Sequence, residues 1–172
     1  FASRQANIPF ISIKVTGISR FSLLESLDEA PRLRSGIHDN EEEIAEWERV
    51  KDRMYAICAV AAEKGIGVLI DAEDSWIQDP IDKLTMEMME EFNKEKAIVF
   101  NTLQLYRHDR LEFLKMSHRF AQRKGFIYGA KLVRGAYMEK ERQRAADKGY
   151  ASPIQATKED TDRDFDVATE YC

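Results

Sequence analysis

Residues 65–71 read G-I-G-V-L-I-D, a short apolar run that ends at an acidic residue. An apolar run of this length, without alternation, is typical of a strand that is buried on both faces in a parallel sheet. Gly65 ends the helical pattern before it, because glycine tolerates the left-handed conformation in which many helices end. The stretch therefore predicts a helix, a buried strand and an acidic strand end in direct succession.

The same arrangement recurs along the chain. Strands are predicted at 8–16, 65–71, 97–104 and 126–134, and the last three begin about thirty residues apart, which is the size of a βα unit. Such units build parallel sheets, either doubly wound or closed into a barrel. The first strand-to-helix turns lack the G-x-G-x-x-G fingerprint, which disfavours a dinucleotide-binding doubly wound sheet. Four strands cannot close an eight-stranded barrel, so the chain is interpreted as an excerpt of a larger protein.

Helix boundaries are predicted from capping residues. Asn40 is a good N-cap for a helix over 41–64, and Glu43 completes a capping-box pattern. Asp79 followed by Pro80 predicts a cap and a first helical residue, and Asp109 is the expected cap of a helix that ends before Gly125. Further predictions are a short helix over 21–27, a major helix over 138–148, a loop over 31–40, and a last helix from Thr161.

Composition indicates one soluble globular domain that can bury a core, since the 172 residues are 44% hydrophobic and 33% charged. The net charge of -5 argues against a nucleic-acid surface, which needs a concentrated basic face. No apolar run approaches the roughly 20 residues of a membrane span, and residues 1–13 do not resemble a secretory signal. The scattered histidines lack metal-ligand spacing, so no metal site is expected.

Polar residues follow the predicted strands, at the end where ligands bind in βα folds. In a barrel, Lys14, Asp71, Gln104 and Lys131 would form a ring at one mouth. An unpaired buried cation costs several kcal/mol, so Lys131 is expected to pair with Asp71, and the surplus of cations favours an anionic ligand. The alternative is a purely structural polar layer that caps the barrel.

The motifs at these positions resemble the proline dehydrogenase family. They are I-K-V-T at 13–16, I-D-A-E-D at 70–74, F-N-T-L-Q at 100–104, and K-L-V-R-G-A-Y at 131–137 followed by E-x-x-R-A. The resemblance implies a distorted (βα)8 TIM-type barrel holding FAD, of which residues 1–172 cover roughly the first half, about four βα units. It also implies oxidation of L-proline to Δ1-pyrroline-5-carboxylate, with hydride transfer to FAD and electrons passed to a membrane quinone.

The resemblance further implies roles for individual residues. Lys14 would bind the substrate carboxylate and Tyr137 would pack near the substrate, while Asp71 and Lys131 would be the catalytic residues. Lys131 stands where many bacterial members have arginine, and Arg134 where other members have lysine; both exchanges keep positive charge near the flavin. The implied cofactor-binding residues are Ile70 (through its backbone), Gln104, Lys131, Arg134, Gly135 and Ala136.

By the same resemblance, the whole protein would associate peripherally with a membrane. The expected location is the cytoplasmic side of the inner membrane in a bacterium, or the matrix side of the mitochondrial inner membrane in a eukaryote. The family's second carboxylate clamp is a pair of adjacent arginines, and no Arg-Arg pair occurs in this sequence. The pair is therefore expected in the C-terminal half of the barrel, and the excerpt alone is expected to be inactive.

Three other interpretations stay open from the sequence. A hydroxyproline dehydrogenase would share the fold and the chemistry. A Schiff-base aldolase or lyase would use Lys14 or Lys131 as a nucleophile, but a lysine paired with Asp71 keeps its proton, which disfavours that role. In the third interpretation, the barrel is not catalytic and its polar ring is structural.

Overall fold

The computed structural model describes residues 8–33 and 40–172 of the chain. Within these residues, parallel strands form a four-stranded sheet in the order β1-β2-β3-β4, as the βα pattern predicts. The connections between successive strands are helical, because parallel strands need long crossovers. The strands are β1 (Phe10–Ile13), β2 (Gly67–Ile70), β3 (Val99–Gln104) and β4 (Ala130–Val133).

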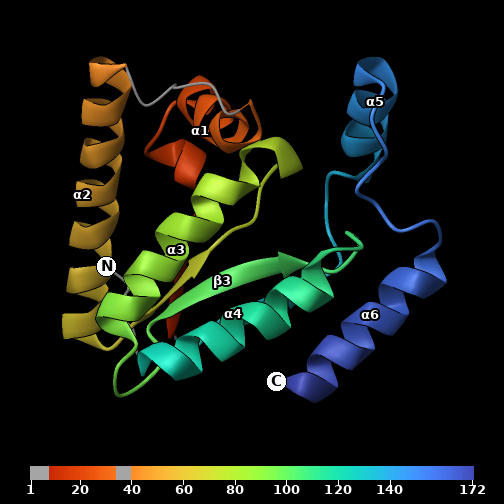
Figure 1. Ribbon diagram of the computed structural model, residues 1–172. Helices are drawn as coiled ribbons and strands as arrows, with labels where there is room; N and C mark the ends of the chain where they lie inside the picture. Colours follow the sequence, from red (N-terminus) through yellow and green to blue (C-terminus); the bar gives the residue numbers. More distant parts are fainter. Residues whose placement is uncertain (1–7, 34–39) are drawn as a thin grey trace.

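Helices cover one face of this sheet. Figure 1 shows α3 and α4 running across β3, with α2 packed beside α3. A short 3-10 helix over Val15–Gly17 follows β1, and another over Ser75–Ile77 follows β2. The helices are α1 (Phe21–Leu33), α2 (Glu41–Lys64), α3 (Gln78–Phe92), α4 (Arg110–Lys124), α5 (Met138–Lys148) and α6 (Lys158–Tyr171).

The hydrophobic core lies between the sheet and the helices. Strand residues that point toward the helices, such as Val68, Ile70 and Val99, are fully buried there. Cys58 of α2 joins this core as a free thiol, and burial raises its pKa to about 12. Because side chains alternate along a strand, the residues between these core positions face the opposite side of the sheet.

Two predicted helix caps differ in detail from the structure. Asn40 caps α2 as predicted, and its Oδ1 accepts hydrogen bonds from the backbone N–H groups of Glu42 and Glu43. The capping-box prediction is wrong, however, since the Glu43 carboxylate binds Arg20 and Ser26. Asp109 precedes α4, but its carboxylate binds neighbouring arginines and makes no cap hydrogen bond. In both cases a nearby donor competes successfully for the carboxylate.

Other element boundaries also shift. Helix α1 continues to Leu33, so the first part of the predicted loop over 31–40 is helical, and residues 34–39 of that loop lie outside the described residues. Helix α3 begins at Gln78, which places Asp79 inside its first turn and not at the cap. Helix α6 begins at Lys158, earlier than the predicted Thr161, because Thr157 caps it by accepting from the backbone N–H of Asp160.

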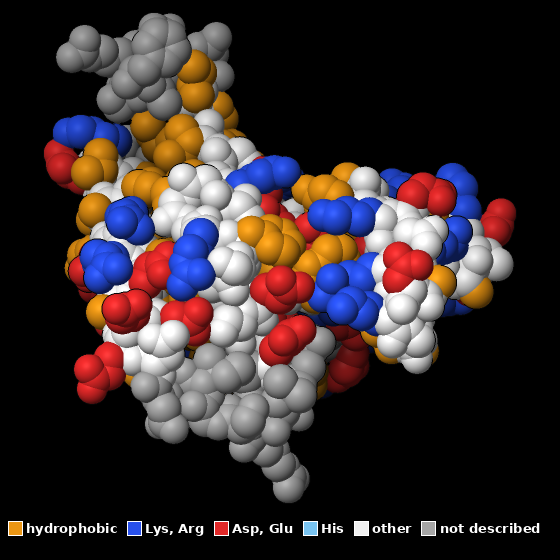
Figure 2. Space-filling model, turned by 90° about the horizontal axis from the view of Figure 1, so that it is seen from above, with side chains coloured by type: hydrophobic (Ala, Val, Ile, Leu, Met, Phe, Trp, Pro, Cys, Tyr) orange, Lys and Arg blue, Asp and Glu red, His pale blue; other side chains and the backbone are white. Residues whose placement is uncertain are grey.

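On the face shown in Figure 2, acidic and basic side chains are interspersed among apolar ones. None of the helices in the described part of the chain is both long enough and apolar enough to span a bilayer.

Candidate active site

The strand register places four side chains in one row at the carboxyl end of the sheet. Ile13 lies opposite Ile70, so Lys14 is level with Asp71, and each of them directly follows the end of its strand. Ile70 lies opposite Asn101, and Thr102 lies opposite Lys131. The row therefore runs Lys14, Asp71, Thr102 and Lys131 across all four strands. Gln104 follows on β3, two residues after Thr102 and on the same face.

Asp71 and Lys131 form the ion pair that the sequence predicts. Lys131 Nζ lies 2.7 Å from Asp71 Oδ1, and Ser12 Oγ donates to the same oxygen at 2.7 Å. Partial burial by itself raises the pKa of Asp71, but the hydrogen bonds from Lys131 and Ser12 and the charge of Lys131 outweigh it. The pKa of Asp71 is therefore lowered, and the carboxylate is ionised at neutral pH.

Lys14, at the β1 end of the row, contacts Tyr137, which follows β4 in the sequence. Lys14 Nζ lies 3.0 Å from the Tyr137 hydroxyl, although 123 positions separate them in the sequence. This hydrogen bond raises the pKa of Lys14 above its ordinary value. The ammonium is exposed and charged, so it can also bind an anionic group that enters the site.

Gln104 ties the ends of β2 and β3 together. Its Nε2 donates to the backbone oxygen of Glu73 at 2.8 Å, and both residues are buried. The Glu73 carboxylate in turn accepts hydrogen bonds from the backbone N–H and the hydroxyl of Thr16, which follows β1. These contacts hold the ends of three strands in a fixed arrangement around Asp71.

Gly135 lies where a larger residue would not fit. Its φ of 140° is a conformation that L side chains rarely adopt, and an added Cβ would lie 2.5 Å from the ring of Tyr106. The backbone N–H of Tyr106 donates to Arg134 O at 2.7 Å, which fixes this turn against β3. Gly135 and Ala136 thus present backbone, with little side chain, to the space above the row.

Arg134 and Ile70 differ from the other predicted site residues. Arg134 was expected in a buried strand, but it follows β4 and its side chain is 50% exposed. Its Nε lies 2.6 Å from Asp162 Oδ1 of α6, and its guanidinium lies over the Phe165 ring. Arg134 therefore has a protein partner that the sequence did not predict. The side chain of Ile70 packs into the core, so only its backbone is available to a ligand.

The residues at the carboxyl ends of the strands surround a pocket of about 320 Å³. All the predicted site residues except Ile70 line it, together with Ala72, Thr102 and Val133. The donors that line it fit a flat anionic cofactor: the ammonium of Lys131, the guanidinium of Arg134 and the amide of Gln104. The buried hydroxyl of Thr102 has no hydrogen-bond partner among the described residues, and the turn at Gly135 leaves room for close approach.

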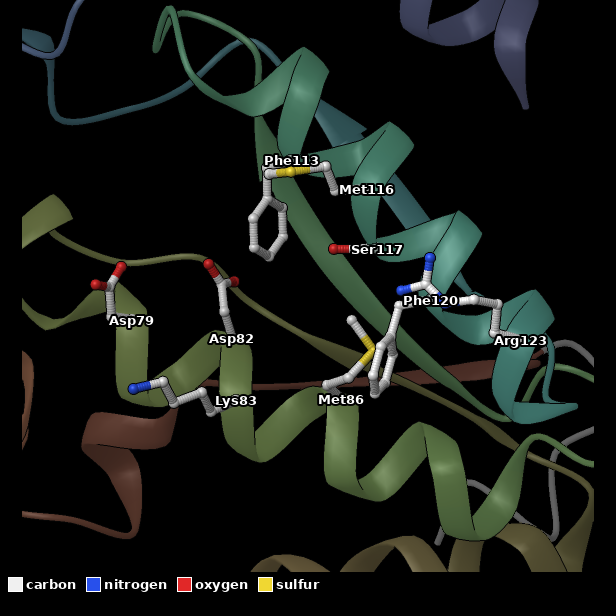
Figure 3. A pocket seen from close by; sticks show the side chains of 9 residues that line it. All are labelled: Asp79, Asp82, Lys83, Met86, Phe113, Met116, Ser117, Phe120 and Arg123. Carbon is white, nitrogen blue, oxygen red and sulfur yellow. The ribbon is translucent and has the colours of Figure 1, made fainter.

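A larger hollow of about 520 Å³ lies between α3 and α4, on the helical side of the sheet. Figure 3 shows Met86 of α3 and Phe120 of α4 turned toward each other in it. Asp82 lies at its edge but is already paired with Arg110 at 2.7 Å. None of the predicted site residues lines this hollow, so the polar pocket at the strand ends remains the candidate active site.

Sequence reasoning missed Ser12, Thr102 and Tyr106. Ser12 stands two residues before Lys14, and Thr102 two before Gln104, so strand alternation from a predicted site residue would have placed both on the pocket face. Tyr106 carries no such signal, because its role depends on the distant turn at Gly135. Among the described residues, no group of three or more His, Cys, Asp or Glu side chains could hold a metal ion.

Comparison with known proteins gives consistent matches. A family model described as proline dehydrogenase matches residues 2–172. The chain is 40% identical over 131 residues to proline dehydrogenase 1, mitochondrial, of Homo sapiens, covering 76% of this chain and 22% of that protein. It is 38% identical over 113 residues to hydroxyproline dehydrogenase of Xenopus laevis, covering 66% of this chain and 24% of that protein. The chain thus spans less than a quarter of either relative.

The fold matches a solved structure of proline utilization A (PutA) from Corynebacterium freiburgense. The TM-score is 0.76 at 22% identity, and the match covers 98% of this chain and 16% of that one. This likeness confirms the predicted fold class, a partial TIM-type α/β barrel with parallel strands. Because the family model matches nearly the whole length of the chain, the chain belongs to the proline dehydrogenase family.

Proposed function

We propose that the protein to which this chain belongs oxidises L-proline to Δ1-pyrroline-5-carboxylate. The observation that carries the proposal is the row of Lys14, Asp71, Thr102 and Lys131 beside Tyr137, in a chain of the proline dehydrogenase family. Forming the ring C=N bond removes a hydride from carbon and a proton from nitrogen. Residues 1–172 would then be part of the catalytic barrel, which is completed by its C-terminal half.

Lys14 is assigned to the substrate carboxylate. Its ammonium is exposed, lines the pocket and stays protonated, because its hydrogen bond to Tyr137 raises its pKa. An ammonium–carboxylate contact is charge-assisted and therefore stronger than a neutral hydrogen bond. Tyr137 would orient Lys14 and form one wall against the proline ring. The second clamp, an arginine pair, is expected outside this chain, so the chain alone is expected to be inactive.

Asp71 is assigned to hold Lys131 in place. The 2.7 Å ion pair fixes an ammonium in the middle of the pocket, and Ser12 fixes the carboxylate. A cation held in this way stabilises negative charge that develops beside it during reaction, and it needs little reorganisation at that moment. The two residues act together: Lys131 supplies the charge and Asp71 its position.

FAD is the cofactor that we propose for this pocket, where it would supply the hydride acceptor and pass electrons to a membrane quinone. Lys131, Gln104 and Thr102 would face it from the strands. Arg134, Gly135 and Ala136 would hold it at the turn after β4, and the backbone of Ile70 would lie beside it. Electron transfer to a membrane quinone implies peripheral attachment, at the bacterial inner membrane or on the matrix side of the mitochondrial inner membrane.

Hydroxyproline is the alternative substrate, and the likeness to the frog hydroxyproline dehydrogenase supports keeping it. A Schiff-base lysine is disfavoured, since such a lysine needs a lowered pKa and that of Lys14 is raised. Lys131 is held in an ion pair with Asp71.

The full-length protein tests the proposal. Its visible spectrum should show flavin bands that bleach when L-proline is added without oxygen, and hydroxyproline in a parallel cuvette should bleach them more slowly. Faster bleaching by hydroxyproline would favour the alternative. A protein that stays colourless when FAD is added, or a flavin that neither amino acid reduces, would reject the proposed function.

A further inference from the structure

Outside the pocket, a fully buried carboxylate lies on α5, the helix that begins directly after the pocket residue Tyr137. Glu141 of α5 is 0% exposed. Its Oε1 accepts the backbone N–H of Ser75 at 2.7 Å, and its Oε2 accepts the Ser75 hydroxyl at 2.6 Å. Burying a carboxylate is costly unless donors satisfy it, and here both donors belong to Ser75, the first residue of the 3-10 helix that follows β2.

Further contacts join the same two segments. Lys140 Nζ lies 2.6 Å from Oδ2 of the buried Asp74. The cationic groups of Lys140 and Arg144 lie over the Trp76 ring, 5.1 Å and 4.2 Å from its centroid, within the range of cation–π attraction. Residues 74–76 therefore form the surface on which the first turns of α5 are docked.

Helix α5 also contacts α1, because Arg144 pairs with Glu25 at 2.9 Å and Lys140 lies over the Phe21 ring. The docking surface on residues 74–76 matters because it holds the turn of α5 that is next to Tyr137. Figure 1 shows α5 at the edge of the molecule, away from α2, α3 and α4. Tyr137 is the N-cap residue of α5, and the backbone N–H of Glu141 donates to its carbonyl oxygen at 2.9 Å. The position of the Tyr137 hydroxyl, 3.0 Å from Lys14, thus depends on where the first turn of α5 lies.

The contact between Glu141 and Ser75 joins two segments, α5 and the segment after β2, which are not equally constrained. The loop after β2 is also held by Gln104, which binds Glu73 O, and by Gln78, whose Oε1 accepts the Glu73 N–H at 2.8 Å. Asp71 is further held by Lys131 and Ser12. Loss of Glu141 would therefore loosen the first turn of α5, and with it Tyr137, more than it would move Asp71.

We propose that Glu141 is a positioning residue for substrate binding: by anchoring α5 to Ser75, it sets Tyr137 against Lys14. This inference rests on the proposed function, because it assigns Glu141 to the carboxylate-binding side of that site. It predicts a defect in binding the substrate, with the chemical step largely preserved.

The test uses the full-length flavoprotein with Glu141→Ala, and Glu139→Ala as the control on an exposed residue of the same helix. The ligand is cyclopentanecarboxylate, a ring carboxylate without an oxidisable amine, and its Kd is measured from the change in flavin absorbance. For Glu141→Ala we expect the Kd and the KM for L-proline to rise about tenfold, the scale of one charge-assisted hydrogen bond, with kcat within about twofold. Glu139→Ala should match the unmodified enzyme.

Two further variants separate positioning from simple loss of stability. Glu141→Gln keeps an oxygen for the Ser75 N–H and should restore much of the affinity. In a Tyr137→Phe background, Glu141→Ala should add little to the KM, because both changes disturb the same contact. Fully additive effects, or an unchanged Kd in Glu141→Ala, would overturn the inference. An unmodified enzyme that does not oxidise proline would instead reject the proposed function.

Discussion

Lys131 and Asp71 meet across an intervening strand. β2 and β4 are not neighbours in the sheet, yet the ammonium and carboxylate lie 2.7 Å apart, above Thr102 of β3. The pair can span β3 because Lys131 has a long side chain and the two residues share one level of the register. Both partners therefore face the pocket, and neither is hidden in the core.

The first prediction concerns this pair. In the full-length enzyme, Lys131→Ala should lower the rate of flavin reduction by proline by roughly a hundredfold, because it removes a positioned charge. Lys131→Arg keeps the charge and should retain most of the rate. Stopped-flow absorbance under anaerobic conditions measures both. Equal rates in the alanine variant and the unmodified enzyme would show that the pair is only structural.

The second prediction concerns Lys14. Lys14→Ala should raise the KM for L-proline by about ten- to a hundredfold, the effect of losing one to two charge-assisted contacts. Tyr137→Phe should raise it less, because the ammonium remains. Lys124→Ala removes an exposed lysine that pairs with Glu90 and does not line the pocket, and serves as the control. Steady-state kinetics over a range of proline concentrations decide the outcome; a fall in kcat at constant KM would contradict the assignment.

The third prediction concerns the turn after β4. Gly135→Ala should greatly reduce flavin content, because the added Cβ would lie 2.5 Å from the Tyr106 ring. Gly149 also has a positive φ, of 71°, but a Cβ there would meet nothing within 4 Å. Gly149→Ala should therefore cost only the conformational strain of the left-handed backbone, about 1–2 kcal/mol, and leave flavin content unchanged. The ratio of flavin to protein absorbance measures the difference, and equal ratios would refute the steric argument.

The fourth prediction concerns a buried ion pair at the edge of the hollow between α3 and α4. Arg110 Nη1 lies 2.7 Å from Asp82 Oδ2, and both side chains are nearly fully buried. Arg110→Ala leaves a buried carboxylate without this partner and should lower the free energy of unfolding by about 3–5 kcal/mol. Arg119 pairs with Glu112 in solvent, so Arg119→Ala should cost less than about 1 kcal/mol. Urea denaturation measures the free energy of unfolding of both variants. Similar losses in the two variants would contradict the prediction.

The fifth prediction concerns acid stability. Burial raises the pKa of Asp109, but hydrogen bonds and charges from Arg110 and Arg107 outweigh it and lower the pKa to about 2. A carboxylate whose pKa is lower in the folded state than its usual value of about 3.9 stabilises the fold above about pH 4 and loses that contribution as the pH falls toward 2. Because the side chain is 37% exposed, we expect about 1 kcal/mol, well below the roughly 2.6 kcal/mol of the full shift.

Asp109→Asn should flatten the fall in unfolding free energy between pH 4 and pH 2, while the exposed Asp52→Asn should leave the slope unchanged. Urea denaturation at several pH values measures the slopes. Parallel slopes for Asp109→Asn and the unmodified protein would show that Asp109 does not titrate with this stabilising network.

Much of the site follows from the sequence, because it depends on local pattern and strand register. Apolar runs identified β2 and β3, and each strand ends in polar residues on the side where ligands bind. Parallel βα units place these ends at one edge, so Lys14, Asp71, Gln104 and Lys131 could be expected to face one pocket, as they do. The pairing of Asp71 with Lys131 followed from the cost of an unpaired buried charge.

The sequence alone did not determine which other charged groups pair. Arg134 reaches Asp162 of α6, Glu43 binds Arg20 and Ser26, and Glu141 binds Ser75. Each of these long side chains has several candidate partners at similar separations in the sequence. The choice depends on how distant helices dock against the sheet, which is set by packing over the whole domain. For that physical reason, the residues at the strand ends could be predicted from the sequence, while the contacts that hold α5 and α6 against the pocket were decided only by the tertiary structure.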